Sequence, residues 1–302
     1  MIHAAAALHG FAISGPISGL MHIAEQPFLR YAFLAGAAIA AAAGLVGHFV
    51  VLRSAVFTGD ALSHVAFTGA IAALAAGADL LIGLYGACIA VALGMAALGR
   101  RGEADDTVIG SVFAWILGLG ALFLSIYARS RTGADGTSGV NVLFGTIFGL
   151  SASQALTDAL VCLAVCVTII VIGRPLLFAS VDPAVARASG IPVRALGFIF
   201  LGLVGLTAAA ATQAVGALLL LGLIAAPAGA AQRLTCRPHN ALWLSAGLAI
   251  GSVWVGLLIA YSAPQMPPSF GILSVATLTY LIAFAFTRRA GAAPAGGRAS
   301  RP

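Results

Sequence analysis

The sequence predicts an all-α fold, a polytopic transmembrane helical bundle with about nine spans. Apolar residues make up 61% of the 302 residues, charged residues make up 8%, and the mean hydropathy is +1.07. A water-soluble domain carries roughly 45–50% apolar and about 25% charged residues, so this chain cannot build a water-facing surface. The apolar residues also form blocks of about 20 residues, the length of a helix that crosses a bilayer.

The predicted spans follow one another from position 29 to position 287, which we take as one transmembrane domain. A further apolar stretch, 140–150, is too short to cross and is predicted to be a re-entrant or broken half-helix, enclosed by protein or lining a cavity. Residues 1–28 are weakly apolar and broken by Gly15-Pro16, which favours an interfacial segment; if they span, the count becomes ten. Residues 288–302 have the composition of a disordered cytoplasmic tail. The nine spans are 29–52, 60–77, 79–99, 107–128, 155–174, 195–211, 214–231, 241–262 and 270–287.

The distribution of arginine predicts the orientation of the bundle. All fifteen basic residues are arginine, and they lie between the apolar blocks. If the turn at 53–59 is cytoplasmic and the spans alternate, twelve arginines lie inside, and Arg30, Arg129 and Arg131 lie outside. Positive residues concentrate on the cytoplasmic side of membrane proteins. We therefore predict a multi-pass protein of the inner (cytoplasmic) membrane with a cytoplasmic C-terminus.

The absence of lysine excludes two kinds of chemistry from this sequence. A Walker-type phosphate loop needs a lysine for the β and γ phosphates, and Schiff-base catalysis needs an amine. Any ATP that drives the protein must therefore be hydrolysed on another chain. Apart from Asp60 and His64, the sequence shows no buried nucleophile–base pair or metal-protease motif, so we expect no enzyme activity. The pI of about 9.7 does not indicate nucleic-acid binding, because the arginines do not share one face.

Two ionisable residues at the start of the second predicted span form the first candidate site. An ionisable group inside a span is costly and is usually functional. Asp60 and His64 stand at i and i+4, which places them on one helical face with Cβ atoms about 5–6 Å apart. A carboxylate oxygen and an imidazole nitrogen suit zinc and manganese better than copper(I). The spacing equally allows Asp60 to be a helix N-cap, with His64 incidental.

The other intramembrane candidates carry weaker expectations. Asp79 and Asp158 lie at predicted span ends near the outer face, where we expect solvated or capping carboxylates. His48 stands alone on an alanine-rich helix, and a satisfied structural histidine is the expected state. Cys162 and Cys166 lie one helical turn apart, but cysteine commonly acts as a small buried apolar residue.

The longest polar interruption, 174–194, predicts a short, self-capped helix on the cytoplasmic side. Asp182 is a good N-cap, and Pro183 fits the first helical position. The following residues supply about two turns, Gly190 fits the C′ position, and Pro192 stops the helix. A plain loop needs no such capping, whereas an element that docks on a cytoplasmic partner does.

Four segments of the sequence form recognisable motifs: GHFVVLRSAVFTGDALSHVAFTGA (47–70), VNVLFGTIFGLS (140–151), VDPAVARASGIPV (181–193) and VGALLLLGLIAAPAGAA (215–231). With these motifs the sequence resembles the permease family of bacterial zinc and manganese ABC importers. The first and third motifs are fairly specific, and all four occur in the order and spacing of the family. The similarity covers roughly residues 27–287.

The resemblance implies an importer permease that moves a divalent metal, zinc or manganese, into the cell by alternating access, with no permanently bound cofactor. It implies two cytoplasmic ATP-binding subunits, an extracytoplasmic metal-binding protein and a second permease, identical or paired. It also implies that Asp60 and His64 line the metal route. The segment 181–193 is implied to couple to the ATPase through Asp182, Pro183, Ala186, Arg187 and Gly190.

The sequence departs from the family pattern at one position, and two other functions are compatible with a helical membrane protein. Family members often carry an acid directly after the LFG element, where this chain has Thr146, so a charged ligand is not expected there. A permease for a metal chelate such as a siderophore or cobalamin would share the architecture without needing a pair like Asp60 and His64. A secondary transporter predicts inverted repeats and more buried acids at the midplane, and the sequence presents neither clearly.

Overall fold

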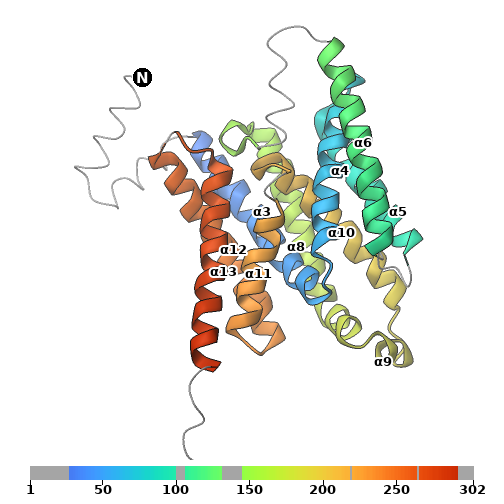
Figure 1. Ribbon diagram of the computed structural model, residues 1–302, viewed down its shortest axis with the longest axis vertical. Helices are drawn as coiled ribbons and strands as arrows, with labels where there is room; N and C mark the ends of the chain where they lie inside the picture. Colours follow the sequence, from blue (N-terminus) through green and yellow to red (C-terminus); the bar gives the residue numbers. More distant parts are fainter. Residues whose placement is uncertain (1–26, 100–105, 131–144, 218–219, 264, 292–302) are drawn as a thin grey trace, which may run out of the picture.

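The described part of the chain consists of helices joined by short connections (Figure 1). The computed structural model describes residues 27–99, 106–130, 145–217, 220–263 and 265–291. Within these ranges eight helices are long and apolar enough to cross a membrane. The all-α prediction is confirmed. The helices are α3 (Pro27–Leu52), α4 (Val56–Ala75), α5 (Leu80–Leu98), α6 (Asp106–Ser130), η3 (Ile147–Gly149), α8 (Ala152–Val181), α9 (Pro183–Ala188), α10 (Val193–Val215), α11 (Leu220–Leu234), α12 (Pro238–Ser262) and α13 (Pro268–Gly291).

The long helices form two groups that meet at α3 and α10 (Figure 1). In one group, α3, α11 and α13 each pack on α12, and α11 also packs on α3 and α13. In the other, α4 packs on α5 and α6, and α10 packs on α5 and α4; α8 joins the groups by packing on α3 and α10. The most apolar stretches of α3, α4 and α10 are 72% buried, against 17% for α6 and 22% for α13. The candidate residues on α3 and α4 therefore lie on interior helices.

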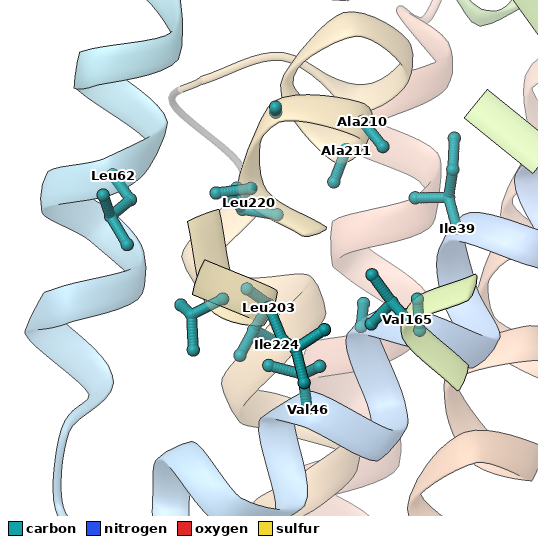
Figure 2. Packing of buried hydrophobic residues seen from close by; sticks show 14 of the residues in the cluster. Ile39, Val46, Leu62, Val165, Leu203, Ala210, Ala211, Leu220 and Ile224 are labelled. Carbon is teal, nitrogen blue, oxygen red and sulfur yellow. The ribbon is translucent and has the colours of Figure 1, made fainter. Parts of the chain in front are cut away.

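Small and branched apolar side chains fill the space between the interior helices. Figure 2 shows Ile39 and Val46 of α3, Leu62 of α4 and Ile224 of α11 among the buried cluster. Helices in lipid associate through close van der Waals contact, which small residues permit. At Gly47, a Cβ atom would lie 2.3 Å from the carbonyl oxygen of Ile224, so only glycine allows α3 and α11 to approach this closely.

The contact between α4 and α5 is also made by backbone. A Cβ atom on Gly69 would lie 2.4 Å from the carbonyl oxygen of Gly83, and one on Gly83 would lie 2.3 Å from the carbonyl oxygen of Gly69. The two helices thus touch at mutually opposed glycines. Their connection is short, because only residues 76–79 separate the end of α4 from the start of α5.

The predicted end of the fifth span was wrong. We expected the helix to stop at Arg174, before Pro175, but α8 continues to Val181. A proline removes one backbone hydrogen bond, and the turns that follow are held because Leu176 and Ala179 are fully buried. Part of the predicted polar interruption is therefore helical.

The predicted span 214–231 is not one helix. Residues up to Val215 belong to α10, which ends at Gly216 in a left-handed conformation with φ of +98°. The next helix, α11, has 15 residues with Pro227 inside it. At 1.5 Å per residue it is about 22 Å long, short of the roughly 30 Å hydrocarbon core. The described residues thus hold eight helices of spanning length and one shorter apolar helix.

Three predictions fall wholly or partly outside the described residues. The interfacial segment 1–28 lies outside except for its last two positions, and the tail 288–302 lies outside from position 292 onward. The half-helix expected at 140–150 is described from position 145, where the chain forms the single turn η3. These domain boundaries stay predictions.

Candidate functional site

Asp60 and His64 lie on the one face of α4 that its neighbours leave partly open. From position 57 to position 71, every residue of α4 is buried except Phe57, Asp60 and His64. Spacings of three and four place these three residues on one side of a helix. The prediction that Asp60 and His64 share a face is confirmed by the continuous helix Val56–Ala75.

The alternative of Asp60 as an N-cap is wrong. The helix begins four positions earlier than expected, at Val56, and its N-cap position is Ala55, which makes no side-chain cap. Asp60 is therefore a residue of the helix interior, where its carboxylate is not needed to satisfy the first turn. A partly buried carboxylate inside a membrane helix requires another explanation.

Both side chains retain unused ligand atoms. The His64 ring packs edge-on against Phe113 of α6, with 5.2 Å between ring centroids. The neighbouring hydroxyl, Ser63 Oγ, donates to the backbone oxygen of Asp60 at 2.7 Å and not to its carboxylate. Within the described ranges, no hydrogen bond is made by the Asp60 carboxylate or the His64 imidazole, and no cluster of three or more His, Cys, Asp or Glu side chains is present. One copy of the chain thus offers two ligands here.

Arg53 fixes the turn that leads into α4. Its Nε donates to Ser180 Oγ at 2.8 Å, and its guanidinium lies 4.8 Å from the ring centroid of Phe200 on α10. The turn itself contains Ser54 in a left-handed conformation with φ of +56°. Ser180 stands two positions before Asp182, so a single side chain joins the start of α4 to the end of α8.

The short helix predicted at 182–190 is present as α9. Asp182 Oδ1 accepts hydrogen bonds from the backbone N–H groups of Ala184 and Val185, each at 3.0 Å, and Pro183 occupies the first turn. At the other end, Gly190 has φ of +82°; its N–H donates to the Arg187 carbonyl. The predicted capping is confirmed at both ends.

The exposure of α9 divides its residues into two sets. Ala186 is fully buried, because it faces the rest of the bundle, and the N–H of Ile191 donates to its carbonyl oxygen. Val185 is 49% exposed, and Arg187 is also exposed, with its Nε donating to the Pro183 carbonyl at 3.0 Å. Of these residues, Val185 and Arg187 point away from the bundle, whereas Ala186 packs against it.

Asp158 is not the solvated acid that we expected. It is fully buried in α8, and Tyr85 of α5 donates to its Oδ1 at 2.6 Å. With its amide nitrogen turned toward the carboxylate, Gln213 of α10 donates to Oδ1 at 3.1 Å and to Oδ2 at 3.3 Å. The backbone oxygen of Gln213 accepts from the N–H of Thr146 at 3.3 Å. This network joins three helices to the turn that precedes α8.

Only Asp158 of this network could be singled out from the sequence. An acid one turn inside an apolar block marks Asp158, but Tyr85 and Gln213 come from other helices with no local pattern. The expectation for Asp79 is confirmed, since its carboxylate caps α5 by accepting from the N–H of Leu81 at 2.7 Å. Cys162 is buried, as expected of a small apolar residue, while Cys166 is partly exposed; both are free thiols.

Among the described residues, eight helices of spanning length define a polytopic membrane protein. The sequence pattern of the ABC 3 transport family matches residues 25–287. The chain belongs to this family of ABC transporter permeases, and it is a multi-pass protein of the cell membrane.

Similar proteins cover almost the whole chain. The manganese transport system membrane protein MntC of Listeria innocua is 28% identical over 276 residues, which is 91% of this chain and 95% of that protein. MntC of Halalkalibacterium halodurans is 30% identical over 269 residues, 87% of this chain and 89% of that protein. The solved structure of PsaBC from Streptococcus pneumoniae in complex with Fab matches with a TM-score of 0.75 and 26% identity, over 89% of this chain and 94% of that one.

Proposed function

We propose that this chain is the permease subunit of an ABC importer that moves Mn²⁺ into the cell, driven by ATP hydrolysed on a separate subunit. The observation that supports it best is the pair Asp60 and His64 on the open face of α4, with ligand atoms uninvolved in other bonds. Family membership gives the transporter class, and relatives named for manganese transport favour this metal over zinc.

Two copies of the chain complete the ligand set. A two-fold axis beside the open face of α4 brings two carboxylates and two imidazoles together, because an isologous contact repeats the same patch on both subunits. Carboxylate oxygen and imidazole nitrogen suit divalent manganese. Two carboxylates neutralise the dication inside the bilayer, where an unpaired charge is costly. A homodimer is therefore part of the proposal.

The cytoplasmic partner binds at α9. Its capped ends fix a short helix whose Val185 and Arg187 are exposed. The chain contains no lysine for a phosphate loop, so the ATP-binding subunits must be other proteins. In the orientation predicted from arginine, α9 faces the cytoplasm, the C-terminus is also inside, and an extracytoplasmic metal-binding protein delivers Mn²⁺ to the opposite face.

The experiment is uptake of radioactive Mn²⁺ by proteoliposomes that contain the permease, its ATPase and its binding protein. Asp60→Asn and His64→Ala should each reduce uptake more than about tenfold, because the first removes both negative charges from the site of the dimer and the second removes both imidazole ligands. Asp79→Asn, which changes an exposed capping acid, is the matched control and should transport normally. Normal uptake by His64→Ala, with the complex intact, would rule out this site.

A further inference from the structure

A groove at one end of the bundle is lined by residues that are not part of the proposed metal site. It lies between α8 and α12, which both pack on α3 and scarcely on each other, so α3 forms its floor. Its volume is about 380 Å³. The residues that matter for its chemistry are His48 of α3, Val171, Arg174 and Leu177 of α8, and His239 and Trp243 of α12.

One part of this groove is cationic. The exposed side chains of Arg174 and His239 line it, beside the N-terminus of α12 at Pro238. No acidic residue is present among the described residues that line it. Backbone N–H groups at a helix N-terminus favour an anion, and a guanidinium is the side chain best suited to bind phosphate.

The floor supplies a second indication of a ligand. His48 is 2% exposed, and its Nδ1 has no hydrogen-bond partner among the described residues. A buried polar atom without a partner is costly. The sequence therefore keeps an unsatisfied imidazole under the groove, although an alanine or leucine would pack at lower cost. The expectation that His48 is a satisfied structural histidine is not met.

The remaining wall of the groove is apolar and open to the outside. Val171 is 73% exposed and Trp243 is 49% exposed, and Leu177 lines the same space. The His239 ring stands edge-on to Trp243 with 6.5 Å between centroids. A ligand that fits both the cationic part and the apolar wall of the groove has an anionic group and a hydrocarbon chain.

The groove also lies near the ends of the helices that line it, where we expect lipid headgroups. His48 is four positions before Leu52, the end of α3, and His239 is the second residue of α12. Both are at the end of the bundle that carries α9, as is Arg174, seven positions before the end of α8. Tryptophan concentrates at this level of a membrane protein.

We propose that this groove binds one anionic phospholipid, with the phosphate held by Arg174 and His239 and an acyl chain along Val171 and Leu177. Basic pockets between transmembrane helices on the cytoplasmic side bind anionic lipid headgroups in this way. The proposal requires the membrane but not the metal route, so it stands independently of the proposed function.

The experiment is native mass spectrometry of the purified full chain, incubated with phosphatidylglycerol or with phosphatidylcholine of the same acyl chains. Phosphatidylglycerol should bind in a one-to-one ratio at a lipid concentration about tenfold lower than phosphatidylcholine does. Both headgroups carry the anionic phosphate, but the choline cation of phosphatidylcholine is repelled by the cationic part of the groove, where no acidic residue lines it. The double variant Arg174→Gln, His239→Gln should bind it about tenfold more weakly. Arg288→Gln, which removes an arginine from the same end outside the groove, should bind it normally.

Each contrary result overturns the proposal. Equal binding of the two lipids, or unchanged binding by the double variant, would show that the groove does not recognise an anionic headgroup. Displacement of phosphatidylglycerol by inorganic phosphate at equal concentration would identify a site for the free anion. A change in dimer content, with lipid binding unaltered, would make the groove a contact between copies. Arg174→Lys keeps the charge and should retain most binding, which separates loss of recognition from misfolding.

Discussion

Arg53 Nε donates a hydrogen bond to Ser180 Oγ at 2.8 Å, although 127 positions separate the two residues in the chain. Arg53 stands seven positions before Asp60, and Ser180 stands two positions before the N-cap of α9. Ser180 Oγ in turn donates to the Leu176 carbonyl at 2.6 Å, which fixes the acceptor. This contact joins the turn before the helix with the proposed metal ligands to the last turn of α8, just before the helix with the proposed ATPase contact.

Loss of this contact should uncouple transport from ATP hydrolysis. Arg53→Met keeps much of the apolar stem of the side chain and removes its hydrogen bond and charge. Ser180→Ala removes the hydroxyl, which accepts from Arg53 and donates to the Leu176 carbonyl. We expect a several-fold drop in Mn²⁺ transported per ATP hydrolysed for Arg53→Met and a smaller drop for Ser180→Ala, which costs about 1 kcal/mol. Both rates are measured in the same proteoliposomes. Arg288→Met is the control, and an unchanged ratio in Arg53→Met would contradict the coupling role.

Tyr85→Phe should destabilise the permease. The substitution leaves the buried Asp158 carboxylate with Gln213 as its remaining donor among the residues described above. Loss of a hydrogen bond to a buried charged group costs roughly 1.5–3 kcal/mol. Thermal unfolding of the purified protein measures the change in its midpoint. Tyr261→Phe, which removes a hydroxyl from a partly buried tyrosine in α12, should leave the midpoint unchanged; equal midpoints for the two variants would mean that the network is not stabilising.

Gly190→Val and Arg187→Glu should weaken the complex with the ATPase for different reasons. Valine at φ of +82° strains the end of α9 and costs about 1–3 kcal/mol. Glutamate reverses the exposed charge of Arg187 without altering the fold. Both should lower the amount of ATPase that copurifies with the permease. Arg129→Glu, at the opposite end of the bundle in the predicted orientation, should copurify normally, and full recovery of the ATPase with both α9 variants would exclude α9 as the contact.

Reporter fusions should establish the orientation predicted from arginine. A reporter that requires the cytoplasm should be active when fused after Arg289 and inactive when inserted in 263–269. These positions lie at the two ends of α13, whose stretch of spanning length is Pro268–Arg288. The same activity at both positions would show that α13 does not cross, and reversed activity would invert the assignment of α9 to the cytoplasm.

The sequence predicted the class, the helices and the capped element because those depend on local composition. The blocks around 29–52 and 241–262 were recognised from apolarity, and α9 from Asp182 and Gly190. The break at Gly216 was missed, since apolar residues continue on both sides of it and only the backbone conformation ends the helix. The continuation of α8 past Pro175 was missed for the converse reason: buried Leu176 and Ala179 stabilise turns that local propensity disfavours.

The candidate site was predicted in part. The i, i+4 spacing found Asp60 and His64, but the start of α4, which decides against an N-cap, depends on packing and on the turn at Ser54. Arg53 and Ser180, like Tyr85 and Asp158, are brought together by tertiary structure alone. No periodicity along the chain reports which helices become neighbours, so such pairs are found only once the helices are placed.

The opposed glycines Gly69 and Gly83 should constrain how α4 and α5 can move. Their backbones are in contact, and only the four residues 76–79 connect α4 to α5. Sliding one helix along the other would drive each backbone into the next side chain on its neighbour. We therefore expect any tilt of α4 that opens or closes the proposed metal route to carry α5 with it, and to reach α8 through the hydrogen bond from Tyr85 to Asp158.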